Sequence, residues 1–388
     1  MRKPEVPGSE TIQNRRRFLQ ATALASTAGL LPAALLPSSG RAAMGRGEPI
    51  AMSNDGTYKV VPLKKPSIRL GIVQSRVRSV RYDQRKKDLA ANLAHMIEMI
   101  DNAFHFSAGA DILFFHEFPL TGFNTWTRAE LLDLSIEIPG AETQAIGRKA
   151  KEYGCYIVFG SYVRDRDWPN HVLSVTTIIG PDGNIVDKHW KARNIKGVFP
   201  GIELFTTTIY DVMDQYVEMY GADALLPVAR TPYGNIATSS VQKEPELFRA
   251  FAMKGAEIIL RTATGGFSPW DIQATAGYNQ VYVAVCNNAV SPENPGFYED
   301  AGSGGSAIYD PRGDILAEAN TKFETLVSAQ IPIEAFRARH RQPIVHMELY
   351  RDVFNTYRNA YGPNLFSAYQ PTDLQDAGRY LNDKSRWK

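Results

Sequence analysis

The chain has 388 residues, a formal net charge of +2, 44% hydrophobic residues and 22% charged residues. This length suits one large domain or two ordinary ones, and the composition is typical of a globular protein with a sizeable core. The basic residues are scattered, which excludes the dense basic stripe of a nucleic-acid-binding surface, so no nucleic-acid partner is expected.

The first 43 residues have the three parts of an export signal in the usual order. Arginines at 15–17 precede an apolar run over 21–36, and a small-residue cleavage site follows near Ala42. The arginine run before Phe18 resembles signals of the bacterial twin-arginine route. The apolar run contains Pro32 and is short for a membrane span, which needs about 20 residues. We therefore expect a periplasmic protein with no membrane span after signal cleavage.

Strands and helices alternate after a polar arm at 44–65. Apolar runs and turn signals predict strands, and apolar residues at helical spacing predict helices. The expected strands are 68–74, 111–115, 156–160, 172–179, 185–189, 257–260, 281–286, 306–309 and 315–319, and the expected helices are 83–106, 142–153, 245–254 and 271–280. Alternation interrupted by two hairpins predicts two packed sheets with helices outside, in one domain over 66–338.

The last segment, 339–388, is rich in Tyr, Arg and Pro. Tyr and Arg are enriched in the cores of protein interfaces. We expect this C-terminal extension to lie at the interface of a homodimer or larger homo-oligomer, although a helix packed on its own subunit is the alternative.

Only two cysteines occur, Cys155 and Cys286, and both lie in apolar runs that are typical of strands. We expect two buried thiols that behave as small hydrophobic side chains, although an exported protein could also join them in a disulfide. No Cys/His cluster has the spacing of a metal site, so neither a metal nor another cofactor is expected.

Two charged residues follow predicted strands. Glu117 comes directly after an apolar strand, where apolar neighbours can raise the pKa of a carboxyl group and make it a usable base. Lys191 ends a hairpin strand, where it could stabilise negative charge that develops during acyl transfer. The ordinary alternatives are a solvated loop glutamate and an exposed strand-end lysine.

A third segment, 234–249, reads as a strand, a tight turn and a helix that begins near Pro245. A residue in such a turn lies beside a helix N-terminus, where negative charge is favoured. This is a suitable place for a nucleophile, although an ordinary strand-to-helix connection has the same pattern.

Together these segments resemble the nitrilase (carbon–nitrogen hydrolase) family over about 66–338. The resemblance includes Glu117-Phe-Pro-Leu-Thr-Gly-Phe, the Pro-Glu-Leu-Phe-Arg helix start at 245–249, and the stretches 253–259 and 305–313. It is greatest to the aliphatic amidases and N-carbamoyl amino-acid amidases. It implies an α/β fold, a four-layer αββα sandwich that dimerises to αββααββα. It also implies hydrolysis of non-peptide carbon–nitrogen bonds through a thioester on cysteine.

The resemblance implies roles for three residues. Glu117 matches the general base, and Lys191 matches the lysine that stabilises the tetrahedral intermediate. Glu203 is the best match to a second glutamate that positions the substrate, against a plain loop carboxylate as the alternative. Glu142 is a weaker match, because a carboxylate at a helix start is already favoured by the helix dipole.

The nucleophilic cysteine of the family is absent. Six residues before Pro245, roughly the spacing in the family, stands Ser239, whereas seven residues after Gly234 stands Val241. The two counts differ by two, so the turn is about two residues shorter than in the family. Ser239 and its neighbour Ser240 are the candidate replacements.

Three hypotheses follow. The first is an amide or carbamoyl hydrolase with an altered nucleophile, either one of the two serines or a water molecule activated by Glu117. The second is a catalytically inactive protein of this fold that binds an amide-like ligand or a partner in the periplasm. The third is a different enzyme that uses Glu117, Glu203 and Lys191 as an acid–base set. The first is preferred because a pure binder has little use for acid–base residues, although a buried Glu–Lys pair can persist for structural reasons.

A substrate pocket is expected beside these residues. Phe123, Trp126, Gly265 and Trp270 are the candidate substrate-binding residues. The stretch 262–270 follows the predicted strand that ends at Leu260 and should line the same crevice. For Trp126 and Trp270, packing at a subunit interface is the alternative.

Overall fold

The computed structural model describes residues 51–194, 205–294 and 302–387. The expected export signal, its cleavage site near Ala42, and Glu203 lie outside these residues. Residues Met44–Lys388 form one compact unit.

The first sheet has six strands in the order β12-β1-β2-β3-β4-β5. β1, β2 and β3 are parallel, whereas β12, β4 and β5 join antiparallel to their neighbours. The strands are β1 Ile68–Gln74, β2 Ile112–Phe115, β3 Tyr156–Asp165, β4 Trp168–Ile179, β5 Ile185–Trp190 and β12 Thr325–Ile331.

The second sheet has six strands in the order β11-β10-β9-β8-β7-β6. Its centre, β7-β8-β9, is again parallel. The strands are β6 Ala229–Thr231, β7 Gly234–Ser239, β8 Ile258–Thr262, β9 Tyr282–Cys286, β10 Ala307–Tyr309 and β11 Ile315–Glu318.

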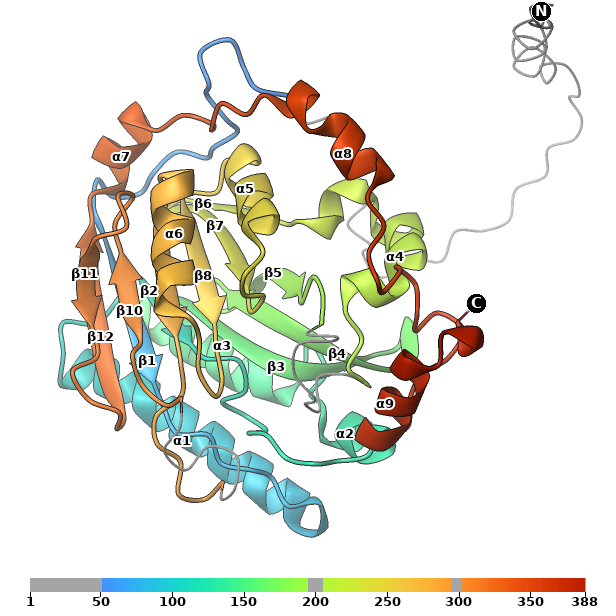
Figure 1. Ribbon diagram of the computed structural model, residues 1–388. Helices are drawn as coiled ribbons and strands as arrows, with labels where there is room; N and C mark the ends of the chain where they lie inside the picture. Colours follow the sequence, from blue (N-terminus) through green and yellow to red (C-terminus); the bar gives the residue numbers. More distant parts are fainter. Residues whose placement is uncertain (1–50, 195–204, 295–301, 388) are drawn as a thin grey trace, which may run out of the picture. The chain divides into compact units, whose positions relative to one another are not determined.

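Alternating side chains build the layers, because successive residues of a strand point to opposite faces. Ile72 and Phe114 of the first sheet share a buried cluster with Ile236 and Leu260 of the second. The opposite faces pack against helices, α1 (Arg85–His105) and α3 (Ala141–Tyr153) on the first sheet, α5 (Pro245–Met253) and α6 (Pro269–Asn279) on the second. The expected αββα sandwich is confirmed (Figure 1).

Smaller elements complete the described chain. They are the helices α2 Arg128–Leu134, α4 Met213–Tyr220, α7 Ile333–Arg339, α8 Arg351–Thr356 and α9 Leu374–Asn382, with single 3₁₀ turns at Tyr82–Gln84, Ile209–Val212, Ala222–Leu225, Met347–Leu349 and Lys384–Arg386.

The C-terminal extension divides into two parts. Leu365, Phe366 and Tyr380 are buried in the core cluster that also holds α1 and the outer face of the first sheet. Arg128 supports this packing by donating to the Pro371 carbonyl. The part around α8 instead leaves several apolar side chains exposed, namely Ile344, Leu349, Tyr350, Val353, Phe354 and Tyr357.

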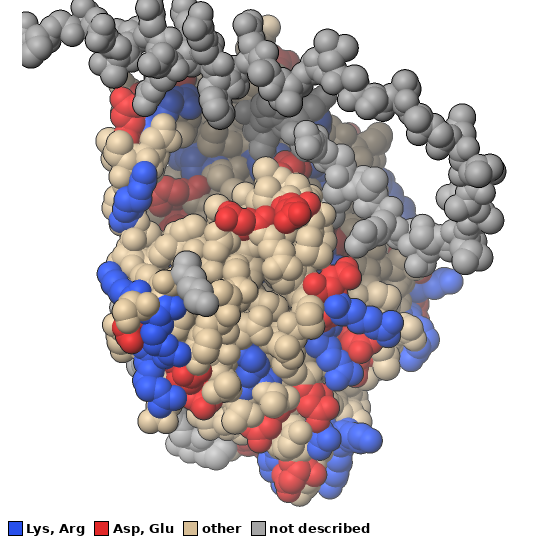
Figure 2. Space-filling view, turned by 90° about the vertical axis from the view of Figure 1, so that its right-hand side faces the viewer, with Lys and Arg blue, Asp and Glu red and all other residues tan. Residues whose placement is uncertain are grey.

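The charged side chains are dispersed. On the face shown in Figure 2, basic and acidic side chains outside the grey atoms lie in small mixed groups around a broad uncharged area. In the described residues, no helix is long and apolar enough to cross a membrane.

Candidate active site

Glu117 and Lys191 form a buried ion pair. Glu117 lies two residues after β2 and Lys191 directly after β5. The Lys191 ammonium donates to Glu117 Oε1 at 3.1 Å, and the two side chains are 6% and 11% exposed. A lysine and a glutamate that are far apart in the sequence are thus brought within hydrogen-bonding distance.

Gly160 of β3 allows this approach. Its amide donates to the His116 carbonyl at 3.1 Å, so the loop that carries Glu117 crosses directly over it. A β-carbon at position 160 would lie 2.3 Å from the Glu117 carbonyl oxygen, well inside van der Waals contact. Only glycine therefore lets the Glu117 backbone lie against β3 at this point.

The ion pair borders a small internal cavity of about 10 Å³, which is room for about one water molecule. The second sheet contributes Thr238, Ser239 and Ser240 from the end of β7. The remaining lining residues are Gly160, Ser174, Val175, Thr176, His189, Trp190 and Thr262. The three segments singled out in the sequence therefore meet at one cavity.

Ser239 is the last residue of β7, and α5 begins at Pro245. The Ser239 hydroxyl accepts a hydrogen bond from the Val241 amide at 3.1 Å. Among the hydrogen bonds of the described chain, none joins the Ser239 or Ser240 hydroxyl to a basic side chain. The two serines thus line the cavity, but neither is paired with a base.

A buried arginine holds the turn that follows β7. Arg261 of β8 donates to the Val241 carbonyl at 2.6 Å and to Asp271 at 2.8 Å, and its guanidinium lies 4.0 Å from the centre of the Phe248 ring. Asp271 also accepts from the Lys243 amide at 3.0 Å, at a residue with a left-handed backbone (φ +56°). This network secures the turn between β7 and α5.

Arg261 was not predicted as a structural residue. An arginine at the end of the apolar run Ile258-Ile-Leu is the signal, because a charge in a buried strand requires a partner. Burial lowers the pKa of Arg261, and the nearby Asp271 carboxylate counteracts that change.

His189 was missed as well. It faces the cavity from β5, with Nδ1 3.0 Å from Thr238 Oγ1 and Nε2 3.1 Å from an Asp187 carboxylate oxygen. The spacing of Asp187, His189 and Lys191 by two residues places them on one face of the strand. That alternation was the available signal.

The four expected substrate-binding residues do not line this cavity, so their role in substrate binding stays a prediction. Phe123 and Trp126 are buried in the core beneath the first sheet, where Trp126 Nε1 donates to the Val80 carbonyl. The Gly265 amide donates to the Asn288 side chain at 2.8 Å. Trp270 is 60% exposed at the start of α6, in the helical layer that covers the outer face of the second sheet.

Both cysteines are free and buried, as the sequence predicted. Burial raises the pKa of Cys155 to about 12 and that of Cys286 well above its ordinary value. Neither thiol lines the cavity, so neither replaces the family nucleophile. Within the described ranges, no three His, Cys, Asp or Glu side chains are grouped to hold a metal ion.

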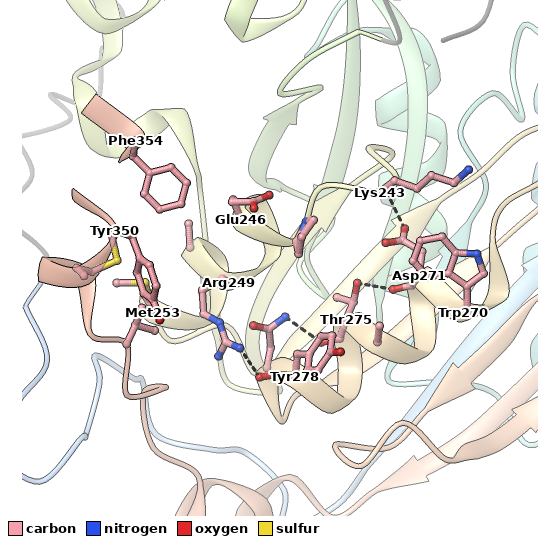
Figure 3. A pocket seen from close by; sticks show the side chains of 16 residues that line it. Lys243, Glu246, Arg249, Met253, Trp270, Asp271, Thr275, Tyr278, Tyr350 and Phe354 are labelled. Atoms are coloured by element: carbon pink, nitrogen blue, oxygen red, sulfur yellow. Dashed lines mark hydrogen bonds between the residues drawn. The ribbon is translucent and has the colours of Figure 1, made fainter. Parts of the chain in front are cut away.

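A larger apolar groove lies on the outer surface, between α5, α6 and the segment around α8 (Figure 3). Its volume is about 560 Å³. Trp270 and Tyr278 of α6 and Tyr350 and Phe354 of the C-terminal segment border it. Arg249 of α5 donates to the Tyr278 carbonyl at 2.7 Å and ties the two helices together.

Comparisons of the sequence with known proteins find carbon-nitrogen hydrolases and omega-amidases. Residues 76–341 match the family model described as Carbon-nitrogen hydrolase. The chain is 27% identical to omega-amidase NIT2-A of Xenopus laevis over 227 residues, which is 56% of this chain and 76% of that protein. It is 26% identical to omega-amidase NIT2 of Mus musculus over 286 residues, which is 72% of this chain and 93% of that protein.

Solved structures share the fold. A carbon-nitrogen hydrolase from Helicobacter pylori G27 matches with a TM-score of 0.58 at 16% identity, over 74% of this chain and 98% of that one. A double mutant of the amidase from Nesterenkonia sp. AN1 in complex with acrylamide matches with a TM-score of 0.52 at 15% identity. That match covers 76% of this chain and 100% of the other. At these identities the likeness bears on the fold alone.

Proposed function

The chain belongs to the carbon-nitrogen hydrolase family, and from this membership we propose that it hydrolyses an amide or carbamoyl bond of a small molecule with an altered nucleophile. The observation that carries the proposal is the buried Glu117–Lys191 pair, which borders the cavity together with hydroxyl groups from the end of β7. A hydroxyl group or a water molecule would act as the nucleophile in place of the family's thiol.

In this proposal Glu117 takes a proton as the general base, because its carboxylate lies at the cavity wall. Lys191 stabilises the oxyanion that forms when the carbonyl carbon is attacked. Ser239 and Ser240 are the nucleophile candidates of the sequence analysis, and a water molecule bound in the cavity is the third. Glu203 remains the proposed substrate-positioning residue.

The relatives support a small amide as the substrate class. Several are named omega-amidases, and one structural neighbour was solved with acrylamide bound. We therefore propose short aliphatic amides and N-carbamoyl amino acids as the first compounds to offer.

The test is the Glu117→Gln substitution, which keeps the shape of the side chain but removes its basicity. Ammonia release from short amides should fall by about a hundredfold or more in kcat/KM, the usual contribution of a general base. The matched control is Glu142→Gln, since Glu142 lies in the first turn of α3, outside the cavity. It should leave turnover unchanged. Turnover that survives Glu117→Gln would refute this assignment.

A catalytically inactive, ligand-binding protein is the second candidate. The specific observation in its favour is that neither the Ser239 nor the Ser240 hydroxyl is hydrogen-bonded to a basic side chain in the described chain, so neither is activated for attack. Calorimetric binding of a short amide without any ammonia release would favour this candidate over hydrolysis.

We also propose that the chain is exported to the periplasm and acts as a homodimer. The outer groove formed by α5, α6 and the α8 segment is the proposed contact surface, because large apolar side chains are exposed along it. The dimer would then pair two helical layers, in the αββααββα arrangement that the family resemblance implies.

A further inference from the structure

Three polar side chains form a hydrogen-bonded chain that reaches the cavity. Thr238 Oγ1 lies 3.0 Å from His189 Nδ1, and His189 Nε2 lies 3.1 Å from an Asp187 carboxylate oxygen. Thr238 and His189 are buried. A hydroxyl, an imidazole and a carboxylate in this order are the components of a nucleophile that is activated by a base and an orienting group.

The Asp187 carboxylate determines which ring nitrogen of His189 carries the proton. Burial raises the pKa of Asp187, but the hydrogen bonds from His189 and from the Lys188 amide and the charge of Lys188 outweigh it, so the pKa of this carboxyl lies below its ordinary value. An ionised carboxylate only accepts hydrogen bonds, so His189 Nε2 carries the proton. Nδ1 of the neutral ring then has a free lone pair, and the Thr238 hydroxyl donates to it.

The Thr238 side chain lies on the inner face of β7, between the two sheets. Thr238 follows Ile236 by two residues on β7, so its side chain lies on the face that packs against the first sheet. Glu117, Lys191, His189 and Thr238 all line the same cavity. The Thr238 hydroxyl is therefore held by a base at the wall where the proposed reaction takes place.

We propose that Thr238 is the nucleophile, that His189 is its base, and that Asp187 is a positioning residue that fixes the tautomer of His189. This inference rests on the proposed function. It replaces Ser239 and Ser240 in the nucleophile role and gives the proton of the attacking hydroxyl to His189, so that Glu117 acts as the base in the later step with water. Thr238 is preferred because its hydroxyl is hydrogen-bonded to a base, His189, whereas the Ser239 hydroxyl accepts a hydrogen bond from the Val241 amide. An unactivated hydroxyl is a weak nucleophile at neutral pH.

The reaction balances with these groups alone. Thr238 Oγ1 attacks the amide carbonyl carbon, a C–O bond forms, and the hydroxyl proton moves to His189 Nδ1. The carbonyl electron pair moves to its oxygen, beside the Lys191 ammonium. When the pair returns, the C–N bond breaks and the leaving amine takes the proton from His189. Water then hydrolyses the Thr238 ester by the same steps, with Glu117 as base, and releases the acid.

The first experiment compares substitutions at Thr238. Thr238→Val keeps the side-chain shape and removes the hydroxyl, so kcat for a short amide should fall by about a thousandfold. Thr238→Ser keeps a hydroxyl and should retain measurable turnover. The control is Thr177→Val on β4, a buried threonine that does not line the cavity and whose hydroxyl has no hydrogen-bond partner in the described chain. It should retain full activity.

Asp187→Asn tests the positioning role. The amide can donate to Nε2 and so favour the other tautomer, in which Nδ1 carries the proton and cannot accept from Thr238. We expect kcat to fall by about a hundredfold or more while KM stays within about twofold, because the substrate-binding surface is unchanged. A purely structural role would instead lower the thermal midpoint and leave kcat per folded molecule unchanged.

Covalent labelling separates this inference from the proposed function. The full chain is incubated with p-nitrophenyl acetate, and peptide mass spectrometry locates the acetyl group. Acetyl on Thr238, lost in Thr238→Val, is the expected result, whether or not any amide is turned over. Acetyl on Ser239 or Ser240, or none on this segment, overturns the inference. Failure of the wild-type chain to hydrolyse any amide overturns the proposed function instead.

Discussion

At the scale of single residues, Glu117 and Lys191 depend on each other. Both side chains are almost fully removed from water, and the distance between their charged atoms is 3.1 Å. Removing one partner of a buried pair leaves a charge that has lost both water and its counter-ion, which is strongly destabilising. The pair can therefore persist for stability as well as for chemistry, and the two reasons require separate measurements.

Lys191→Met should lower the free energy of unfolding by about 3 kcal/mol, because it leaves the Glu117 carboxylate buried without this ammonium. Adding Glu117→Gln should restore most of that loss, since the double variant buries no charge at this position. Urea unfolding of the wild type and the three variants gives the comparison. If Lys191→Met and the double variant lost the same free energy of unfolding, the two residues would not be energetically coupled.

The control for that cycle is a pair that remains hydrated. Arg164 and Glu137 are 3.3 Å apart, and each side chain is about half exposed. Arg164→Met should change the free energy of unfolding by no more than about 0.5 kcal/mol, as expected for a surface position.

At the scale of elements, apolar periodicity predicted the central strands and the long helices well. β1 was expected at 68–74 and is found at Ile68–Gln74, and α3 was expected at 142–153 and is found at Ala141–Tyr153. β12 was missed because it is an edge strand with alternately exposed, mixed side chains, which carry a weak signal. Its antiparallel pairing with β1 along the whole strand fixes a conformation that the sequence pattern alone does not predict.

The candidate active site was also predicted only in part. Glu117 and Lys191 could be predicted because each follows a strand within a recognisable segment. The contacts of Arg261 with Asp271 and of His189 with Thr238 could not, because these partners lie 10 and 49 residues away in the sequence. Only the packing of the two sheets brings such groups into contact.

Glu324, the residue before β12, ties the start of that edge strand to α1 and to the segment that follows β1. It accepts from His95 of α1 at 2.6 Å and from the Arg76 amide at 2.9 Å. Burial raises the pKa of Glu324, but these hydrogen bonds and the charges of both residues outweigh it, and the pKa falls from 4.5 to about 2. The ionised form is therefore the one that the fold favours.

The sign of the pH dependence follows. A carboxyl whose pKa is lowered by folding stabilises the protein above its unfolded pKa, and this contribution is lost as the pH falls toward the folded value. Glu324→Gln should therefore be less stable than the wild type by about 3 kcal/mol at pH 7. The difference should shrink between pH 4.5 and pH 2. Urea midpoints at pH 7, 4.5 and 3 measure it.

Glu318→Gln provides the comparison, because Glu318 is an exposed residue of β11 in the other sheet. Its effect on the urea midpoint should be small and independent of pH. A Glu324→Gln effect that stays constant down to pH 3 would show that the carboxylate contributes no differential stability.

At the scale of the whole molecule, the two outer layers differ. The layer over the second sheet bears the apolar groove, with Tyr278 72% exposed, whereas α9 and its neighbours cover part of the other side with their own buried side chains. Cutting the chain after Arg339 would remove Phe366 and Tyr380 from the core, so it would test folding rather than association.

Point substitutions test the dimer more cleanly. Tyr278→Ser combined with Phe354→Ser should convert the proposed dimer to a monomer, because both side chains border the groove. Gel filtration with light scattering at several protein concentrations measures the mass. Phe106→Ser is the control, since Phe106 is 85% exposed directly after α1, on the other helical layer. A dimer that survives the double substitution would place the contact elsewhere.

The two buried cysteines have a practical consequence. Both thiols have raised pKa values, so neither is a reactive thiolate near neutral pH. A single cysteine introduced on the surface would therefore react alone with a maleimide dye or a spin label, without any prior removal of the natural thiols. One such label on α1, on the other helical layer and away from the proposed contact surface, would report the separation of two copies by energy transfer or paired-spin spectroscopy.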